Sequence, residues 1–324
     1  MTRYLSPVTR HPQIALIGAK GMLARKVAEQ ASRKYTVIPL DLPEFDMTDR
    51  TRVLERISSL RPEIIINCAA FTQVDRCETE EVLANKVNGE AVGFLAEAAK
   101  AVDATLVHVS TDYVFSGEQN RPYREDDPTG PQSAYGRSKL LGEQAIMSSG
   151  LEKYFIVRTS WLYGPGGNNF VETMIRLAKE REELRVVADQ VGSPTYTGDL
   201  AEAIVRLVKS DTSRVKSKGS SPVTRHPSLV TGFPSPPFGL YHFADEGQCS
   251  WHEFAMAIID LAREWGEPVV TRRIVPITTA DYPLPAKRPA YSALSNEKYK
   301  TVTGARIPDW RESLKNYFSE RGRV

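Results

Sequence analysis

The fold of this chain is decided by residues 13–24, which read Gln13-Ile14-Ala15-Leu16-Ile17-Gly18-Ala19-Lys20-Gly21-Met22-Leu23-Ala24. An apolar run predicts a strand, and a G-x-x-G-x-x-A turn leads from it into a helix that starts at Met22. Gly18 permits a tight turn, Gly21 lets the backbone approach a pyrophosphate, and Ala24 lets the helix pack closely on the strand. The free N–H groups at the start of such a helix attract phosphate. A plain strand-to-helix connection uses similar turns, but this context favours dinucleotide binding.

The next apolar run, Thr36–Leu40, predicts a second strand that ends at Asp41. An acid about twenty residues beyond the glycine turn usually binds the adenosine ribose, which favours NAD. Arg25 and Lys26 in the first helix are alternative partners for a 2′-phosphate, and a solvated helix face explains them equally well. The loop that begins with Asp46 and Met47 is predicted to lie beside the adenine, although helix capping alone also explains Asp46.

Strands and helices alternate along the rest of the chain, which predicts a parallel sheet covered on both faces. Further strands are expected at 64–68, 105–109 and 155–158, and further helices at 50–60, 88–102, 169–180 and 199–209. Polar and aromatic side chains follow two of these strands at the carboxyl end, where open α/β sheets bind ligands. They are Ser110, Thr111 and Asp112 after one strand, and Ser160, Trp161 and Tyr163 after the next.

Tyr135 and Lys139 belong to the segment Tyr135-Gly136-Arg137-Ser138-Lys139, and this spacing places both side chains on one helix face. A phenol with a pKa of ~10 is a poor acid–base catalyst at neutral pH, but a nearby ammonium lowers that pKa. The hydroxyl of Thr111 is a candidate to share a substrate oxygen with the phenol. The spacing is common on solvated helices, so it gains weight only from the glycine turn before it.

Composition fits a soluble enzyme and argues against several other classes. The 324 residues are 41% hydrophobic, enough for one large α/β domain and a smaller one. The formal charge is +2 with acids and bases interspersed, which predicts neither a nucleic-acid nor a membrane partner. No apolar run is long enough to span a bilayer, and the first residues lack a signal-peptide stretch. The three cysteines have no metal-binding spacing, which fits a reducing cytoplasm and predicts no metal site.

Residues 213–238 are rich in Ser, Pro, Lys and Gly and show no periodicity, which predicts a disordered insertion. Within it, residues 221–227 repeat residues 6–12 letter for letter. No fixed period follows, so this is not a solenoid repeat, and duplicated DNA is the favoured origin. His11 and His226 lie in the two copies and are therefore not metal candidates.

Several longer segments resemble a known family, the dTDP-4-dehydrorhamnose reductases, which are extended short-chain dehydrogenases/reductases. They are residues 67–75, 88–91, 107–117, 135–139, 158–164, 189–195, 288–292 and 308–310. The wider superfamily shares only the glycine turn and the Tyr/Lys pair, so the other segments are specific. The likeness covers nearly all of the chain except the first residues and the insertion.

The resemblance implies a Rossmann-type doubly wound parallel sheet with a smaller C-terminal α/β substrate domain. Residues 12–168 would bind the dinucleotide, and residues 169–324 would mainly bind substrate, with some segments returning to the first domain. The implied reaction is reduction of dTDP-4-dehydro-β-L-rhamnose to dTDP-β-L-rhamnose, the last step of dTDP-rhamnose biosynthesis. NADPH would supply the hydride, with NADH as an alternative, and the protein would be a cytoplasmic monomer or homodimer.

The resemblance also implies roles for individual residues. Tyr135 would donate a proton to the C4 oxygen, Lys139 would lower the phenol pKa and bind the nicotinamide ribose, and Thr111 would hydrogen-bond the same oxygen. The implied cofactor residues are Gly18, Gly21, Met22, Leu23, Asp41, Asp46, Met47, Ala70, Phe71 and Thr72. The implied substrate residues are Thr111, Asp112, Trp161, Asn169 and Arg288, the last two at the diphosphate. Core packing is the alternative for Trp161, and a structural ion pair is the alternative for Arg288.

Some members of the family dimerise through magnesium held by glutamates, one of them in the first helix. Lys26 stands at that position here, and a lysine cannot ligate magnesium. Two other functions share this fold: a non-catalytic regulatory subunit like that of methionine adenosyltransferase, and a sugar-nucleotide epimerase or dehydratase. Retention of Thr111, Tyr135 and Lys139 favours catalysis, and stoichiometric consumption of NAD(P)H would distinguish the three.

Overall fold

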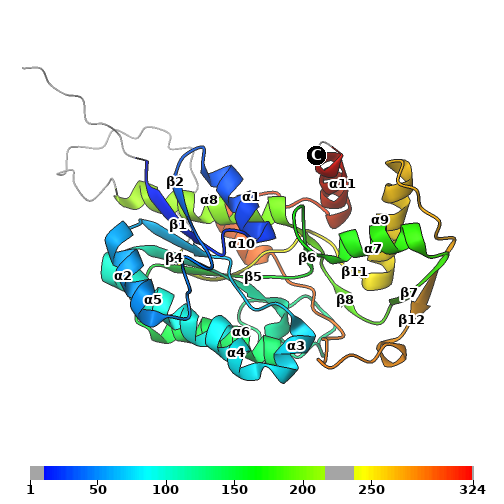
Figure 1. Cartoon of the computed structure of the whole chain (residues 1–324), viewed down its shortest axis with the longest axis horizontal. Helices are drawn as coiled ribbons and strands as arrows, with labels where there is room; N and C mark the ends of the chain where they lie inside the picture. The colour runs from blue at the N-terminus through cyan, green and yellow to red at the C-terminus, as the bar shows by residue number, and fades with distance from the viewer. Residues whose placement is uncertain (1–10, 216–236, 323–324) are drawn as a thin grey trace, which may run out of the picture.

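A six-stranded parallel sheet forms the centre of the computed structural model, which describes residues 11–215 and 237–322 (Figure 1). The strand order is β2-β1-β3-β4-β5-β10, with every neighbouring pair parallel. The strands are β1 (Gln13–Ile17), β2 (Thr36–Leu40), β3 (Ile64–Asn67), β4 (Thr105–Thr111), β5 (Tyr154–Thr159) and β10 (Gly239–His242). The order reverses direction at β1 and β3, the position where doubly wound sheets bind ligands. The predicted α/β fold class is confirmed.

Helices cover both faces of the sheet because successive side chains of a strand point to opposite faces. Ile14 and Leu16 pack under one helical layer, whereas Ala15 and Ile17 pack under the other. The first layer contains α1 (Met22–Ala31), α8 (Thr197–Val215) and α10 (Glu297–Thr303). The second contains α2 (Arg50–Leu60), α5 (Ala91–Val102) and α6 (Ala134–Ser148). Figure 1 shows α1 and α8 on the opposite side of the sheet from α5 and α6.

Short helical segments connect the larger elements of this region. They are α3 (Val74–Thr79), α4 (Glu81–Asn85), the π-helix η1 (Lys86–Glu90) and the 3-10 helix η2 (Asp112–Val114). The expected helix at 88–102 is therefore split, because its first residues form the π-helical turn. None of the helices in the part of the chain that the structure describes is long and apolar enough to cross a membrane.

A separate hydrophobic core lies at one end of the sheet, where α7, α9 and α11 pack together (Figure 1). Its largest fully buried side chains include Phe254, Trp310 and Tyr317. The helices are α7 (Phe170–Glu180), α9 (Trp251–Glu264), α11 (Trp310–Arg321) and the 3-10 helix η4 (Thr279–Asp281). The strands are β6 (Leu162–Tyr163), β7 (Glu183–Val187), β8 (Val191–Gly192), β9 (Thr195–Tyr196), β11 (Cys249–Ser250) and β12 (Arg273–Ile277). The α8, β10 and α10 segments return to the large sheet, and a domain boundary at 168/169 stays a prediction.

The expected insertion at 213–238 lies almost wholly outside the described residues, as do both copies of the repeated heptad apart from His11 and Pro12. At its edges, α8 extends to Val215 rather than ending at 209. The ring of Phe238 lies 5.2 Å from that of Phe155 on β5, measured between centroids. The strand β10 starts at Gly239, directly after this segment, and was not expected from the sequence.

The glycine turn requires glycine at position 18. Gly18 has a φ of +74°, and a Cβ atom there would lie 2.7 Å from the backbone nitrogen of Ala69. Its N–H donates to the carbonyl of Leu40 at 2.9 Å, and its own carbonyl accepts from Gly21 at 2.9 Å. The turn thus joins the ends of β1, β2 and β3 with no room for a side chain.

We expect Gly18→Ala to lower the free energy of unfolding by about 3 kcal/mol, because left-handed strain adds to a backbone clash. Gly266→Ala is the matched control, since Gly266 has a φ of +78° but nothing within 4 Å of its would-be Cβ. This control should lose only about 1 kcal/mol. Urea unfolding of both variants measures the difference, and equal losses would contradict the close approach at Ala69.

Candidate active site

A cavity of about 960 Å³ opens at the carboxyl ends of the central strands. Most of the predicted cofactor residues line it: Gly18, Gly21, Met22, Leu23, Asp41, Asp46, Met47, Ala70 and Thr72. The predicted reactive and sugar-binding residues that line it are Thr111, Asp112, Tyr135, Lys139 and Trp161. Residues from distant parts of the sequence therefore line the same cavity. Their individual roles remain predictions.

Three predicted residues, Phe71, Asn169 and Arg288, do not line this cavity. The backbone of Phe71 is fastened to Asn88, whose side chain accepts from its N–H at 2.8 Å and donates to its carbonyl at 3.0 Å. Arg288 makes a bidentate ion pair with Asp75, at 2.6 and 2.7 Å. Its guanidinium also lowers the pKa of the Asp75 carboxyl. The ion-pair alternative for Arg288 is thus the arrangement present here.

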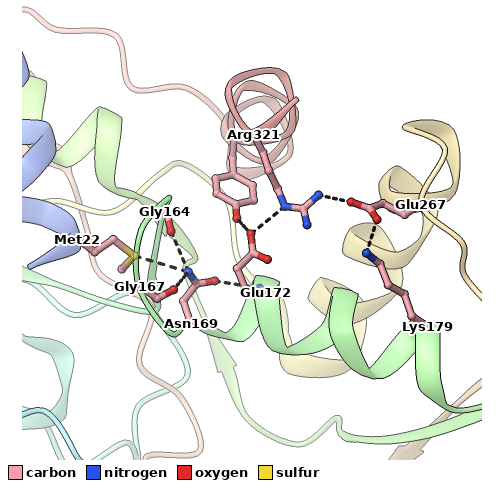
Figure 2. A network of polar contacts seen from close by, with 9 residues as sticks. Met22, Gly164, Gly167, Asn169, Glu172, Lys179, Glu267 and Arg321 are labelled. Atoms are coloured by element: carbon pink, nitrogen blue, oxygen red, sulfur yellow. Dashed lines mark hydrogen bonds and ion pairs between the residues drawn. The ribbon is translucent and has the colours of Figure 1, made fainter. Parts of the chain in front are cut away.

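Asn169, also off the cavity wall, caps the start of α7 (Figure 2). Its Oδ1 accepts from the N–H of Glu172 at 3.1 Å, and its Nδ2 donates to the carbonyls of Gly164 at 2.9 Å and Gly167 at 3.1 Å. The same Nδ2 lies 3.6 Å from the sulfur of Met22. Asn169 therefore ties the loop before α7 to the first turn of α1, and its contact with a diphosphate stays a prediction.

Figure 2 also shows how α11 is held on the smaller core. Glu172 of α7 accepts from Arg321 at 2.9 Å and from the Tyr317 hydroxyl. Arg321 also pairs with Glu267, which is 2.5 Å from the ammonium of Lys179. This chain of charges fixes the C-terminal helix against α7 and the segment that follows α9.

The Thr111–Tyr135 contact is set by close packing of α6 on the end of β4. The Ser133 hydroxyl caps α6 by accepting from the N–H of Gly136 at 3.1 Å. A Cβ on Gly136 would lie only 2.2 Å from the carbonyl oxygen of Tyr113, so glycine lets the helix approach this segment. The Thr111 hydroxyl therefore lies close enough to the Tyr135 phenol to lower its pKa.

The structure contradicts the expectation that Lys139 lowers the pKa of the Tyr135 phenol. Burial raises that pKa above its usual value, and only the nearby Thr111 hydroxyl acts against it. The amino group of Lys139 turns instead toward β4, where it donates to the Val109 carbonyl at 2.7 Å and lies 3.2 Å from Nε2 of His108. The phenol is therefore neutral across the ordinary pH range, which suits a proton donor.

Asp112 presents an unused hydrogen-bond acceptor at the cavity. Its Oδ1 accepts from the Thr111 hydroxyl at 3.0 Å, whereas its buried Oδ2 has no partner. Burial raises the pKa of this carboxyl to about 6, although the nearby Ser292 and Thr111 hydroxyls oppose the shift. An unpaired buried oxygen costs free energy unless a ligand supplies a donor, so Asp112 is suited to accept from a ligand hydroxyl.

Trp161 is held in a strained backbone conformation beside two aromatic residues that the sequence did not indicate. Its φ is +47°, a region that bulky residues rarely adopt outside functional sites. Its ring stacks on Trp251 with centroids 3.5 Å apart and planes 6° apart, and Phe170 lies 4.5 Å from Trp251. All three line the cavity. Trp251 starts α9, far along the chain from Trp161, whereas Phe170 starts α7 only nine residues after Trp161. No motif in the sequence connected either residue with Trp161.

The part of the cavity around Asp41 contains a different cation from those expected. Asp41 accepts from the N–H groups of Lys20 at 2.7 Å and Leu42 at 2.8 Å, and Lys20 lines the cavity beside it. Arg25 reaches the Gly166 carbonyl at 3.4 Å, and Lys26 pairs with two carboxylates of the helices, so neither lines the cavity. Lys20 is thus the basic residue that lies beside Asp41 at the cavity.

Carboxylates surround the Lys26 ammonium, which pairs with Glu29 at 2.9 Å and with Glu320. A cation in this position does not fit a magnesium site. Across residues 11–215 and 237–322, no group of three or more His, Cys, Asp or Glu side chains is placed to hold a metal.

Cys68 lines the cavity as a neutral thiol, since burial raises its pKa to about 12.

A buried ion pair joins α6 to the strand β5 of the central sheet. Glu143 of α6 and Arg158 of β5 are bonded at 2.7 and 2.9 Å, with side chains 0% and 4% exposed. The Ser110 hydroxyl donates to the same carboxylate at 2.5 Å. The pair therefore fixes the helix that carries Tyr135 and Lys139 to the two strands beneath it.

A doubly wound sheet with this glycine turn, and a cavity that brings together Thr111, Tyr135 and Lys139, define a dinucleotide-binding protein of the short-chain dehydrogenase/reductase class. Comparison with known proteins is more specific. The family model described as the RmlD substrate binding domain matches residues 12–322, and the chain belongs to this family.

Three similar proteins illustrate the relationship. The spore coat polysaccharide biosynthesis protein SpsK of Bacillus subtilis is 40% identical over 310 residues, covering 95% of this chain and 98% of the relative. A dTDP-4-dehydrorhamnose reductase of Burkholderia thailandensis is 41% identical over 304 residues, covering 93% and 96% respectively. The solved structure of dTDP-4-dehydrorhamnose reductase from Bacillus anthracis in complex with NADP is 38% identical, with a TM-score of 0.82 over 95% of this chain and 99% of that one.

We expect Glu143→Gln to lower the free energy of unfolding by about 3–5 kcal/mol, because it leaves the Arg158 guanidinium buried without its counter-charge. Glu180→Gln is the control, since Glu180 pairs with Arg176 on an exposed helix face. That variant should change stability by no more than about 0.5 kcal/mol. Equilibrium unfolding of both proteins in urea provides the measurement. A small loss of unfolding free energy for Glu143→Gln would argue against a fully desolvated ion pair.

Proposed function

We propose that the protein reduces dTDP-4-dehydro-β-L-rhamnose to dTDP-β-L-rhamnose with NADPH, the last step of dTDP-rhamnose biosynthesis. The observation that carries the proposal is the position of Thr111 beside Tyr135 on the wall of the cavity that also contains the glycine turn. Family membership and relatives that bear the reductase name support the same activity. The substrate is a dTDP-sugar, as the family implies. What remains to be assigned is the chemical role of each residue of the site.

NADPH supplies the hydride when it is bound. The side-chain-free turn at Gly18 and Gly21 fits a pyrophosphate, and Asp41 with Lys20 fits the adenosine ribose and a 2′-phosphate. The NADP in the Bacillus anthracis relative supports this choice over NADH. We assign Gly18, Gly21, Met22, Leu23, Asp41, Asp46, Met47, Ala70 and Thr72 to the cofactor, with Phe71 contributing through the loop that it anchors. Lys139 also lines the cavity, and we assign it to the nicotinamide ribose.

Tyr135 and Thr111 act on the substrate oxygen. A neutral phenol gives its proton to the C4 oxygen as negative charge develops there, and the Thr111 hydroxyl hydrogen-bonds the same oxygen. Asp112 accepts a hydrogen bond from a sugar hydroxyl through its free Oδ2. Trp161 and Trp251 form an aromatic wall against which the apolar face of a deoxysugar packs.

The cellular setting and the assembly of the enzyme are also proposals. We propose a cytoplasmic protein without nucleic-acid or membrane partners, which the formal charge of +2 and the interspersed acids and bases support. A monomer or homodimer is proposed, without magnesium, because Lys26 occupies the position between carboxylates on α1 and α11.

Incubation with the keto sugar nucleotide and each cofactor in turn tests the activity. We expect stoichiometric loss of NADPH absorbance, formation of dTDP-rhamnose by mass spectrometry and NMR, and slower turnover with NADH. Cofactor binding without consumption would favour a regulatory subunit. Product formed without net consumption would favour an epimerase.

Tyr135→Phe should lower kcat by about 10²–10⁴-fold, because it removes the proton donor. The KM and the dissociation constant of NADPH should stay within a factor of about two, since the ring is preserved. Tyr299→Phe is the control, because Tyr299 is 2% exposed and lies in the core under α10 rather than at the cavity. An unchanged kcat for Tyr135→Phe would remove Tyr135 from the mechanism.

A further inference from the structure

A row of buried polar groups runs behind the cavity from Lys139 to the glycine turn. Nζ of Lys139 lies 3.2 Å from Nε2 of His108, and Nδ1 of His108 lies 3.1 Å from Nδ2 of Asn67. Oδ1 of Asn67 accepts from the N–H of Ala69 at 3.0 Å. The His108 and Asn67 side chains are both 0% exposed, and the function proposed above uses neither.

With the Asn67 amide oriented as it is in this structure, the contacts in this row permit one arrangement of protons. The Ala69 N–H fixes Oδ1 of Asn67, so the amide nitrogen of Asn67 faces the imidazole as a donor. Nδ1 of His108 must then accept, and a neutral imidazole carries its single proton on Nε2. That proton points at Nζ of Lys139. An ammonium has no lone pair, whereas an amine has one, so the contact is satisfied when Lys139 is an uncharged amine.

A charged Lys139 requires the row to be reversed. An ammonium donates to Nε2, which moves the imidazole proton to Nδ1. The Asn67 amide must then turn so that Oδ1 accepts from Nδ1, and the Ala69 N–H loses its acceptor. Ala69 lines the cavity and touches the Gly18 turn, so the charge on the lysine changes the hydrogen bonding at the cofactor turn.

We propose that His108 is a positioning residue for Lys139, and that its tautomer and the Asn67 amide orientation switch together with the protonation of the lysine. The role of Lys139 at the nicotinamide ribose rests on the proposed function, but the coupling itself concerns the free protein. Lys139, His108 and Asn67 come from α6, β4 and β3, so the coupling crosses three adjacent elements.

The other charged and titratable groups near Lys139 agree with an amine that changes charge near neutral pH. Burial lowers the pKa of Lys139 to about 8, against the pull of the Glu143 carboxylate. The Glu143 carboxylate is occupied by Arg158 and Ser110, and Cys68 is a neutral thiol. Burial and the nearby lysine hold the pKa of His108 well below its usual value, so the imidazole stays neutral.

The test is NMR of the full chain with ¹⁵N-labelled histidine, recorded well below and well above pH 8. Two-bond ¹⁵N–¹H correlations distinguish the two tautomers and the imidazolium. The chain has five histidines, and His108→Gln identifies the relevant signal by its loss. We expect the Nε2–H tautomer at high pH, the Nδ1–H tautomer at low pH, and no imidazolium. A single tautomer throughout, or an imidazolium near pH 6.5, would overturn the proposal, and neither outcome bears on sugar reduction.

Two variants separate coupling from mere packing. In Lys139→Met the Asn67 amide still donates to Nδ1, so we expect the Nε2–H tautomer at every pH. In Asn67→Asp the carboxylate accepts from both Ala69 and Nδ1–H, so we expect the Nδ1–H tautomer at every pH. If Asn67→Asp fails to fold, the wild type and Lys139→Met decide the matter, since a tautomer switch that persists in Lys139→Met would exclude the lysine as its cause.

Discussion

The close approach of α6 to the end of β4 is the constraint on which the site depends. Gly136 allows it at the carbonyl of Tyr113, and Gly142 allows a similar approach to the carbonyl of Asn88, since a Cβ at either position would lie 2.2 Å from the oxygen. The buried Glu143–Arg158 pair then fixes the helix to β5. Without this packing, Tyr135 would not meet Thr111, and Lys139 would not reach the carbonyl of β4.

Local sequence rules identified the parts of the site that local geometry determines. The glycine turn and the polar residues at strand ends were predictable because strand, turn and helix spacing place them at one edge of a parallel sheet. Trp251 was not predictable, because its stacking on Trp161 depends on how the smaller core packs against the sheet. The partners of Asn169 and Arg288 were equally inaccessible, since a cap and an ion pair compete with ligand contact only once the chain is folded.

The direction in which the pKa of the Tyr135 phenol is shifted shows where inference from residue spacing fails. A lysine four residues away on a helix is near in sequence geometry, but the rotamer of Lys139 is chosen by acceptors on β4 and not by the phenol. Burial, which cannot be inferred from spacing, then raises the pKa of the phenol. The helix face was correctly predicted, and the electrostatic consequence was not, because it depends on which third group binds the ammonium.

The charged groups of the cavity destabilise the folded protein in the pH range where it would work. Burial raises the pKa of Asp112 to about 6, so folding favours its protonated form, and stability falls as pH rises from the usual carboxyl range through that value. Burial lowers the pKa of Lys139 to about 8, so the folded state favours the amine, and stability falls as pH drops from the usual lysine range through that value. Between these values both groups are ionised at the expense of stability. A ligand that donates to Asp112 and accepts from Lys139 relieves both penalties, and this couples binding to the stability of the fold.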